Sequence, residues 1–203
     1  DRVIAGDPSQ PQAHYLRAAT LARASFTHEA IAGYRRCLEL SPGHSGALLG
    51  LGHVLNAIGD YTGAVESYNA CIRRTPESGE TYWSLANLKT YRFDDALVES
   101  MARLATAPDV TPQSEVNFLF ALGKAWEDRG DFGRAWDYYR SGNDKQRAKV
   151  VYDPVQTEVM NDRLMKVYTA GFIAERADWG NPDPAPIFIF GLPRSGSTLL
   201  EQI

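Results

Sequence analysis

The sequence predicts an all-α protein of repeated helical hairpins that runs, at its C-terminal end, into the start of an α/β domain. Three observations support this prediction. Prolines recur 34 residues apart at Pro8, Pro42 and Pro76. Pairs of alanines, tyrosines, cysteines and leucines share that offset. A short apolar run near the end of the chain precedes a loop rich in glycine and serine. A repeat of this length holds two helices and a turn, so neighbouring repeats can stack and share one core.

Residues 45–78 indicate how one repeat folds. Leucines at i, i+3 and i+7 give a first helix one apolar face; they are Leu48, Leu51 and Leu55. Gly59 and Asp60 supply the turn to a second helix. Pro76 ends that second helix, because proline has no backbone N–H to continue it.

Two other segments repeat this scheme. Residues 11–44 align with residues 45–78 at the offset of 34, and residues 115–148 align at an offset of 71, which is two periods plus three residues. Small residues recur where the two helices of a hairpin are expected to cross closely: Gly52, Ala64, Gly123 and Ala135.

The unit at 79–112 is less regular. We expect its first helix to include Leu88, and Tyr91–Phe93 to shorten the turn by two residues. Asp94 is then the N-cap of the second helix, because a carboxylate can accept a hydrogen bond from a free backbone N–H there.

Cys37 and Cys71 occupy the same place in successive repeats. We interpret both as core residues, because free cysteine packs as a small hydrophobe. A disulfide and a metal site are the alternatives. We expect no metal site elsewhere, since neither His44 nor His53 has a second ligand at suitable spacing.

The composition limits the classes of partner. The formal net charge is -4, which argues against nucleic acid, because binding to phosphates needs a basic surface. We expect no membrane span, since no apolar run approaches the roughly 18 residues that one requires. A cytoplasmic protein is the resulting expectation.

The repeats resemble the tetratricopeptide repeat (TPR). That resemblance implies a superhelix whose concave face is formed by the first helix of each unit and binds a protein or peptide. The residues that this face should carry are Tyr15, Leu49, His53, Asn56, Trp83, Asn87, Phe120, Lys124 and Glu127. They mix aromatic, amide and acidic groups rather than the cationic set that clamps a C-terminal carboxylate. The alternative is that they pack against a neighbouring domain.

The C-terminal part of the chain has a different pattern. Pro154 should start a helix with one apolar face. Residues 181–186 have proline at every second position, which predicts a stiff, extended linker. Ile187–Phe190 is a short apolar run typical of a buried strand in a parallel sheet. We therefore expect a repeat domain over 1–148, a bridging helix and linker over 149–185, and a strand, loop and helix start over 186–203.

The loop after the apolar run has the composition of a phosphate-binding loop. Its residues are Gly191, Leu192, Pro193, Arg194, Ser195, Gly196, Ser197 and Thr198. Backbone N–H groups and the dipole of a following helix would favour an anion. The loop of nucleotide triphosphatases is one alternative, but that loop needs a lysine where Ser197 stands.

Arg194 lies before Ser195 and Gly196, with hydroxyl residues after the glycine. That order resembles the 5′-phosphosulfate loop of sulfotransferases. Residues 186–203 are similar to the start of the catalytic domain in bacterial TPR-sulfotransferases and, more distantly, tyrosylprotein sulfotransferases. Residues 82–90 and 121–125 resemble the repeat region of the same proteins. Those proteins more often have threonine where Ser197 stands.

The sulfotransferase resemblance implies transfer of a sulfuryl group from 3′-phosphoadenosine 5′-phosphosulfate (PAPS) to a hydroxyl or amine, possibly a protein tyrosine, without a metal. Arg194 would stabilise the charge that develops during transfer. The cofactor contacts would come from Gly191, Pro193, Arg194, Ser195, Gly196, Ser197 and Thr198. We expect the chain to be an inactive fragment of a longer enzyme of this kind. The alternative function is a TPR scaffold that binds a partner without catalysis.

Overall fold

The computed structural model describes residues 4, 6–181, 183, 185, 187–191 and 195–201. Within these residues every regular element is helical, and the chain divides into two compact units. The repeat region spans Asp1–Val151, and the C-terminal unit spans Tyr152–Ile203.

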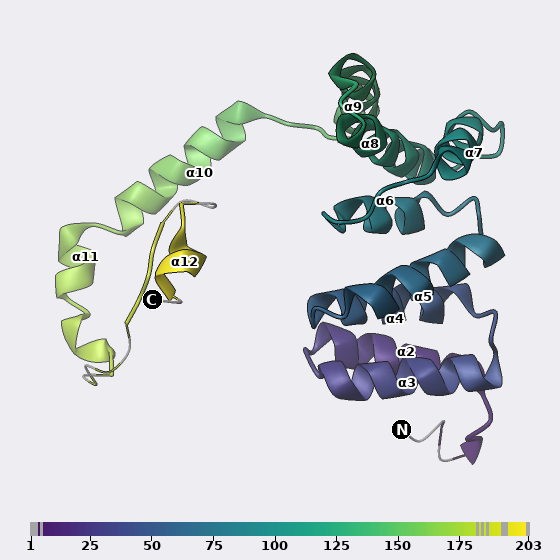
Figure 1. The fold of residues 1–203 in the computed structure, drawn as a ribbon. Coiled ribbons are helices and arrows are strands. Elements are labelled where there is room, and N and C mark those ends of the chain that lie inside the picture. The colour runs from purple at the N-terminus through teal and green to yellow at the C-terminus, as the bar shows by residue number, and fades with distance from the viewer. Residues whose placement is uncertain are drawn as a thin grey trace. The chain divides into compact units, whose positions relative to one another are not determined.

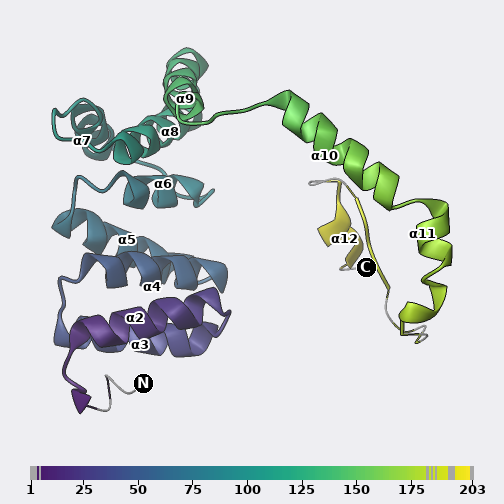
Figure 2. The ribbon, with the colours of Figure 1, turned by 180° about the vertical axis from the view of Figure 1, so that it is seen from behind.

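The repeat region is a stack of antiparallel helices in chain order (Figures 1 and 2). Its helices are α2 (Pro11–Arg23), α3 (Thr27–Leu40), α4 (Ser45–Ala57), α5 (Tyr61–Arg74), α6 (Gly79–Asn87), α7 (Asp95–Ala105), α8 (Pro112–Asp128) and α9 (Phe132–Arg147). The pairs α2–α3, α4–α5 and α8–α9 pack as hairpins, and α3 packs on α4, the first helix of the next unit. The predicted hairpins of the regular repeats are thus confirmed.

The turns between paired helices use glycine and aspartate as the sequence indicated. Gly59 and Gly130 have φ values of +83° and +76°, a left-handed conformation that glycine adopts without strain. The following aspartates cap the second helices. Asp60 accepts a hydrogen bond from the backbone N–H of Gly63 at 3.0 Å, and Asp131 accepts one from Arg134 at 3.0 Å.

The third unit departs from the regular pattern. Helix α6 ends at Asn87, and residues 88–94 form a connection that is longer, not shorter, than the other turns. The expectation of a shortened turn is wrong, because Leu88 and Phe93 leave the helical path and bury their side chains in the core. Both α6 and α7 pack against α8. Asp94 caps α7 as predicted, accepting from the N–H of Leu97 at 2.8 Å.

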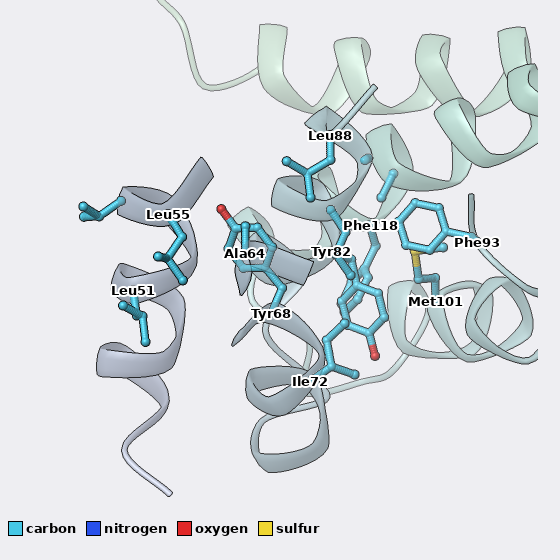
Figure 3. Close-up of a cluster of buried hydrophobic side chains, with 14 of the residues drawn as sticks. Leu51, Leu55, Ala64, Tyr68, Ile72, Tyr82, Leu88, Phe93, Met101 and Phe118 are labelled. Atoms are coloured by element: carbon cyan, nitrogen blue, oxygen red, sulfur yellow. The ribbon is translucent and has the colours of Figure 1, made fainter. Parts of the chain in front are cut away.

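One continuous core joins the helices of the repeat region. Figure 3 shows its middle part, where buried side chains from α4, α5, α6, α7 and α8 lie together. The largest of these fully buried side chains are Tyr68, Tyr82 and Phe118. Cys37 and Cys71 are buried free thiols, which confirms their interpretation as core residues.

The C-terminal unit contains α10 (Pro154–Val167), α11 (Ala170–Ala174), the 3-10 helix η1 (Ala177–Trp179) and α12 (Ser197–Glu201). Helix α10 starts at Pro154 as predicted, with Asp153 as its cap. No side chain of α10 is buried. Within the described residues, no helix is both long enough and apolar enough to cross a membrane.

The predicted strand–loop–helix start of an α/β domain is wrong. Residues 187–190 form no strand, and the side chains of Ile187 and Phe190 are both 88% exposed. The physical reason is that a strand of a parallel sheet needs neighbouring strands for its backbone hydrogen bonds and a cover for its apolar side chains. Neither is present among the described residues, so an apolar run alone does not form the element.

Candidate peptide-binding surface

Equivalent positions on four successive first helices carry large apolar side chains. These residues, the apolar row, are Tyr15 on α2, Leu49 on α4, Trp83 on α6 and Phe120 on α8. Each is only partly buried. The rings of Trp83 and Phe120 lie 5.5 Å apart between centroids, and Phe120 lies 6.4 Å from the ring of Tyr139. The row therefore includes a continuous aromatic surface at its α6–α8 end.

Tyr15 is held at the α2 end of the row by contacts with three residues of α3 and the start of α4. Its ring lies 4.7 Å from the ring of His44 and 6.2 Å from that of Tyr34. Gly46 leaves room for it, because a Cβ at Gly46 would be 3.1 Å from the tyrosine ring. The Nδ1 of His44 accepts a hydrogen bond from the backbone N–H of Ala47 at 3.1 Å and caps α4. Among the described residues, no three potential ligands of the His, Cys, Asp or Glu type form a metal site.

His53 joins α4 to α6 beside the apolar row. Its Nε2 lies 3.0 Å from the Oγ of Ser84, and the hydroxyl of Ser84 donates to the backbone oxygen of Glu80 at 2.8 Å. Because that hydroxyl proton is used, Nε2 of His53 is placed as the donor. Desolvation lowers the pKa of His53, and the Glu80 carboxylate partly opposes this. The imidazole is thus favoured in its neutral form, with Nε2 protonated.

Tyr68 supports His53 from the second helix of the same hairpin. The two rings meet edge-on at 5.6 Å. Burial raises the pKa of Tyr68 to about 12, so its hydroxyl stays protonated at neutral pH.

The α8 end of the surface carries charged groups of both signs. The Lys124 ammonium pairs with Asp128, whose side chain is only 10% exposed, and Arg92 reaches the same carboxylate at 3.3 Å. Glu127 accepts a hydrogen bond from the Tyr139 hydroxyl at 2.6 Å. Burial, followed by this carboxylate, raises the pKa of Tyr139. Lys124 and Arg92 thus share one carboxylate, whereas the Glu127 carboxylate has only a neutral donor among the described residues.

The structure places all nine predicted surface residues on first helices, and each is partly or fully exposed. It brings Trp83 and Phe120 into contact and sets His53 against α6. Glu80 and Ser84, which were not among the predicted residues, complete this part of the surface. Their spacing from Asn87 on α6, at seven and three residues, could have revealed that they share its face.

A separate hollow of about 550 Å³ lies along α2. Its lining comes from Ile4, Gln10, Gln12, Ala13, Leu16, Arg17, Thr20 and Leu21. Four of these lining positions, Ala13, Arg17, Thr20 and Leu21, correspond one repeat later to Ala47, Leu51, Val54 and Leu55 on α4. Those four residues of α4 are buried. Helix α3 packs on α4, so the equivalent face of α2 corresponds to the surface by which one repeat contacts the repeat before it.

The residues of the predicted phosphosulfate loop are only partly described. Pro193 and Arg194 lie outside the described residues, as does Leu192. Gly196 has a φ of +90° directly before α12, in which Ser197 and Thr198 are the first residues. The Oγ of Ser195 occupies the place where a Cβ at Gly191 would sit. The site role of these residues remains a prediction.

Comparisons with known proteins concern the repeats. Residues 15–79 match the family described as "Tetratricopeptide repeat". An uncharacterized protein of Aquifex aeolicus (strain VF5) is 28% identical over 193 residues, covering 95% of this chain and 25% of that protein. The chain thus spans about a quarter of the length of this relative.

Solved structures agree with the observed helical stack. MamA matches with a TM-score of 0.57 and 17% identity, over 74% of this chain and 86% of that chain. MamA from Desulfovibrio magneticus RS-1 matches with a TM-score of 0.54 and 20% identity, over 73% of this chain and 82% of that chain. PilF of Pseudomonas aeruginosa matches with a TM-score of 0.55 and 14% identity, over 87% of this chain and 79% of that chain. At these identities the likeness shows the fold alone, a stack of helical hairpins of the kind that the tetratricopeptide repeat match over residues 15–79 also indicates.

Proposed function

We propose that this chain is an interaction scaffold that binds a protein or peptide segment along the apolar row. The observation that carries the proposal is the partial exposure of Tyr15, Leu49, Trp83 and Phe120 at one repeat position. Tyr15, Leu49 and Trp83 pack against the core and still keep part of their surface exposed, whereas neighbouring helix positions are fully buried. Tyr82 is 1% exposed beside Trp83.

The chemistry of the surface suits an extended segment. Large aromatic side chains that remain open to solvent bury much apolar area when a partner covers them, and such residues dominate binding energies. Asn56 and Asn87 lie on the same helices and can donate to or accept from a peptide backbone. Apolar anchors with a few polar groups around them are the usual composition of a binding groove.

A selection experiment tests this function. The chain is screened against a phage-displayed random peptide library, in parallel with a Trp83→Leu/Phe120→Leu variant. Leucine is the natural residue of the row in α4, so this variant should keep the fold, which circular dichroism and thermal unfolding check. Trp136→Leu is the matched control, because Trp136 is an exposed tryptophan on α9, outside the row.

We expect peptides to be enriched on the wild-type chain and on the Trp136→Leu control, and to be lost from the double variant. If no peptide is enriched, or if the double variant selects the same peptides as the wild type, the scaffold proposal is wrong.

As a second function, we propose that this chain is part of a longer protein that transfers a sulfuryl group from PAPS through the loop at 191–198. The proposal is supported by the order of Arg194, Ser195 and Gly196 and by the left-handed conformation of Gly196 directly before α12. Arg194 would stabilise charge on the leaving phosphate, while backbone N–H groups and hydroxyls after Gly196 would hold the 5′-phosphate.

Calorimetry on the longer protein tests this second function. Adenosine 3′,5′-bisphosphate should bind more tightly than magnesium ATP, and Arg194→Ala should reduce transfer by on the order of 100–1,000-fold. If ATP binds better, or if the Arg194→Ala variant keeps full activity, the transferase proposal fails and the scaffold proposal is unaffected.

A further inference from the structure

We infer that the segment bound by the α6–α8 part of the apolar row is cationic and places an arginine side chain against Trp83 and Phe120. This inference rests on the proposed scaffold function and specifies the chemistry of its partner. It is carried by three features of the same surface: carboxylates without a cationic partner, an accessible aromatic pair, and cations that are already paired with Asp128.

The carboxylates are Glu80 on α6 and Glu127 on α8. Both residues are exposed, and neither has a lysine, arginine or histidine nitrogen within 4.0 Å among the described residues. Glu80 raises the pKa of His53, although desolvation lowers that pKa by more. Glu127 receives only the neutral hydroxyl of Tyr139. Two negative groups at the border of the row therefore stay available to a positively charged partner.

Cations on this surface only partly oppose that charge. Lys124 and Arg92 both pair with Asp128, so these three groups leave one positive charge against the two carboxylates of Glu80 and Glu127. His53 is held neutral by desolvation and uses Nε2 toward Ser84. A partner with an acidic segment or a free C-terminal carboxylate would thus meet no unpaired cation among these residues.

The aromatic pair favours arginine over lysine. The planar guanidinium stacks on aromatic faces and at the same time donates to a carboxylate in a fixed geometry. The chain itself contains this arrangement at another place: the Arg134 guanidinium lies 3.5 Å from the centroid of the Trp126 ring, and its Nε donates to Asp131 at 2.5 Å. Trp83 and Phe120, bordered by Glu80 and Glu127, offer the same two components with the arginine missing.

Peptides recovered from the selection, resynthesised with a fluorescent label, test the inference by anisotropy. Each is compared with a copy in which citrulline, a neutral analogue of similar shape, replaces arginine. We expect a loss of affinity of about fivefold for each engaged arginine, which corresponds to a stacked and partly exposed cation. The Glu80→Gln and Glu127→Gln variants should reduce the difference between the two peptides, because each removes one carboxylate that the guanidinium can pair with. Glu66→Gln is the matched control, because Glu66 is exposed on α5, outside this surface.

The outcomes distinguish a failure of the cationic-partner inference from a failure of the scaffold function. Selected peptides that carry no excess of arginine, or that bind equally well with citrulline, overturn the cationic partner and leave the scaffold function standing. Unchanged discrimination in both glutamine variants also overturns it. If no peptide is selected at all, the scaffold function fails, and the inference fails with it.

Discussion

The ring of Tyr68 on α5 lies directly against the backbone of Gly52 on α4. A Cβ at Gly52 would be 2.5 Å from the Cε1 atom of this ring, closer than real contacts allow. The same relationship recurs between Gly123 on α8 and Tyr139 on α9, where the distance is again 2.5 Å. The glycine of the first helix thus leaves space that a tyrosine ring of the second helix fills. This pairing sets how closely the two helices of a hairpin approach.

Replacing Gly52 by alanine should therefore destabilise the repeat region. Because Tyr68 is only 1% exposed, we expect overpacking of its ring to cost about 1–3 kcal/mol. Urea unfolding followed by circular dichroism measures the change. Gly133→Ala is the control, because a Cβ at this helical glycine of α9 meets nothing closer than 3.7 Å. If Gly52→Ala unfolds like the control, the packing relationship is wrong.

The aspartate caps of the second helices should contribute measurably to stability. Asp60→Ala removes the acceptor for the N–H of Gly63, and we expect a loss of about 1 kcal/mol. Asp60→Ser should restore most of it, because a serine hydroxyl can accept the same bond. Asp109→Ala serves as control, since Asp109 is exposed and lies between α7 and α8. Equal unfolding midpoints for Asp60→Ala and Asp109→Ala would contradict the role of the cap.

The stability of the chain should depend on pH through His53. Desolvation lowers the pKa of His53 in the folded state, so the unfolded state takes up a proton first as the pH falls. The stabilisation is complete above the ordinary histidine pKa of about 6.5 and is lost as the pH falls through the lower folded value. His53→Gln keeps a donor for Ser84 but cannot titrate.

Urea unfolding between about pH 5 and 8 tests this linkage. The wild type should lose stability toward acid pH relative to His53→Gln, while His28→Gln, at an exposed position on α3, should follow the wild type. Parallel curves for the wild type and His53→Gln would show that His53 does not titrate as described.

Both cysteines should be unreactive in the folded protein and free in the unfolded one. Cys37 is 0% exposed and Cys71 is 2% exposed, and burial raises the pKa of the Cys37 thiol. A chromogenic thiol reagent should detect neither in native buffer and both in denaturant without reductant. Rapid labelling before unfolding would contradict their burial, and fewer than two thiols in denaturant would indicate a disulfide.

The sequence by itself determined the regular repeats. The 34-residue offset placed Gly59, Asp60 and the two cysteines in equivalent positions, and these features act over a few residues. A left-handed glycine, an aspartate cap and a leucine face need only their own helix and its neighbour in the chain. Local chemistry of this kind can be read from spacing alone.

Only the tertiary structure decided the third unit, the exact surface and the C-terminal segment. Leu88 leaves α6 because the core accepts its side chain, a preference that no local pattern expresses. Glu80 and Ser84 join the surface because α6 lies beside α4. Ile187–Phe190 forms no strand, since a sheet depends on partners from elsewhere in the chain. Each of these outcomes depends on contacts between distant residues, and a one-dimensional pattern does not contain them.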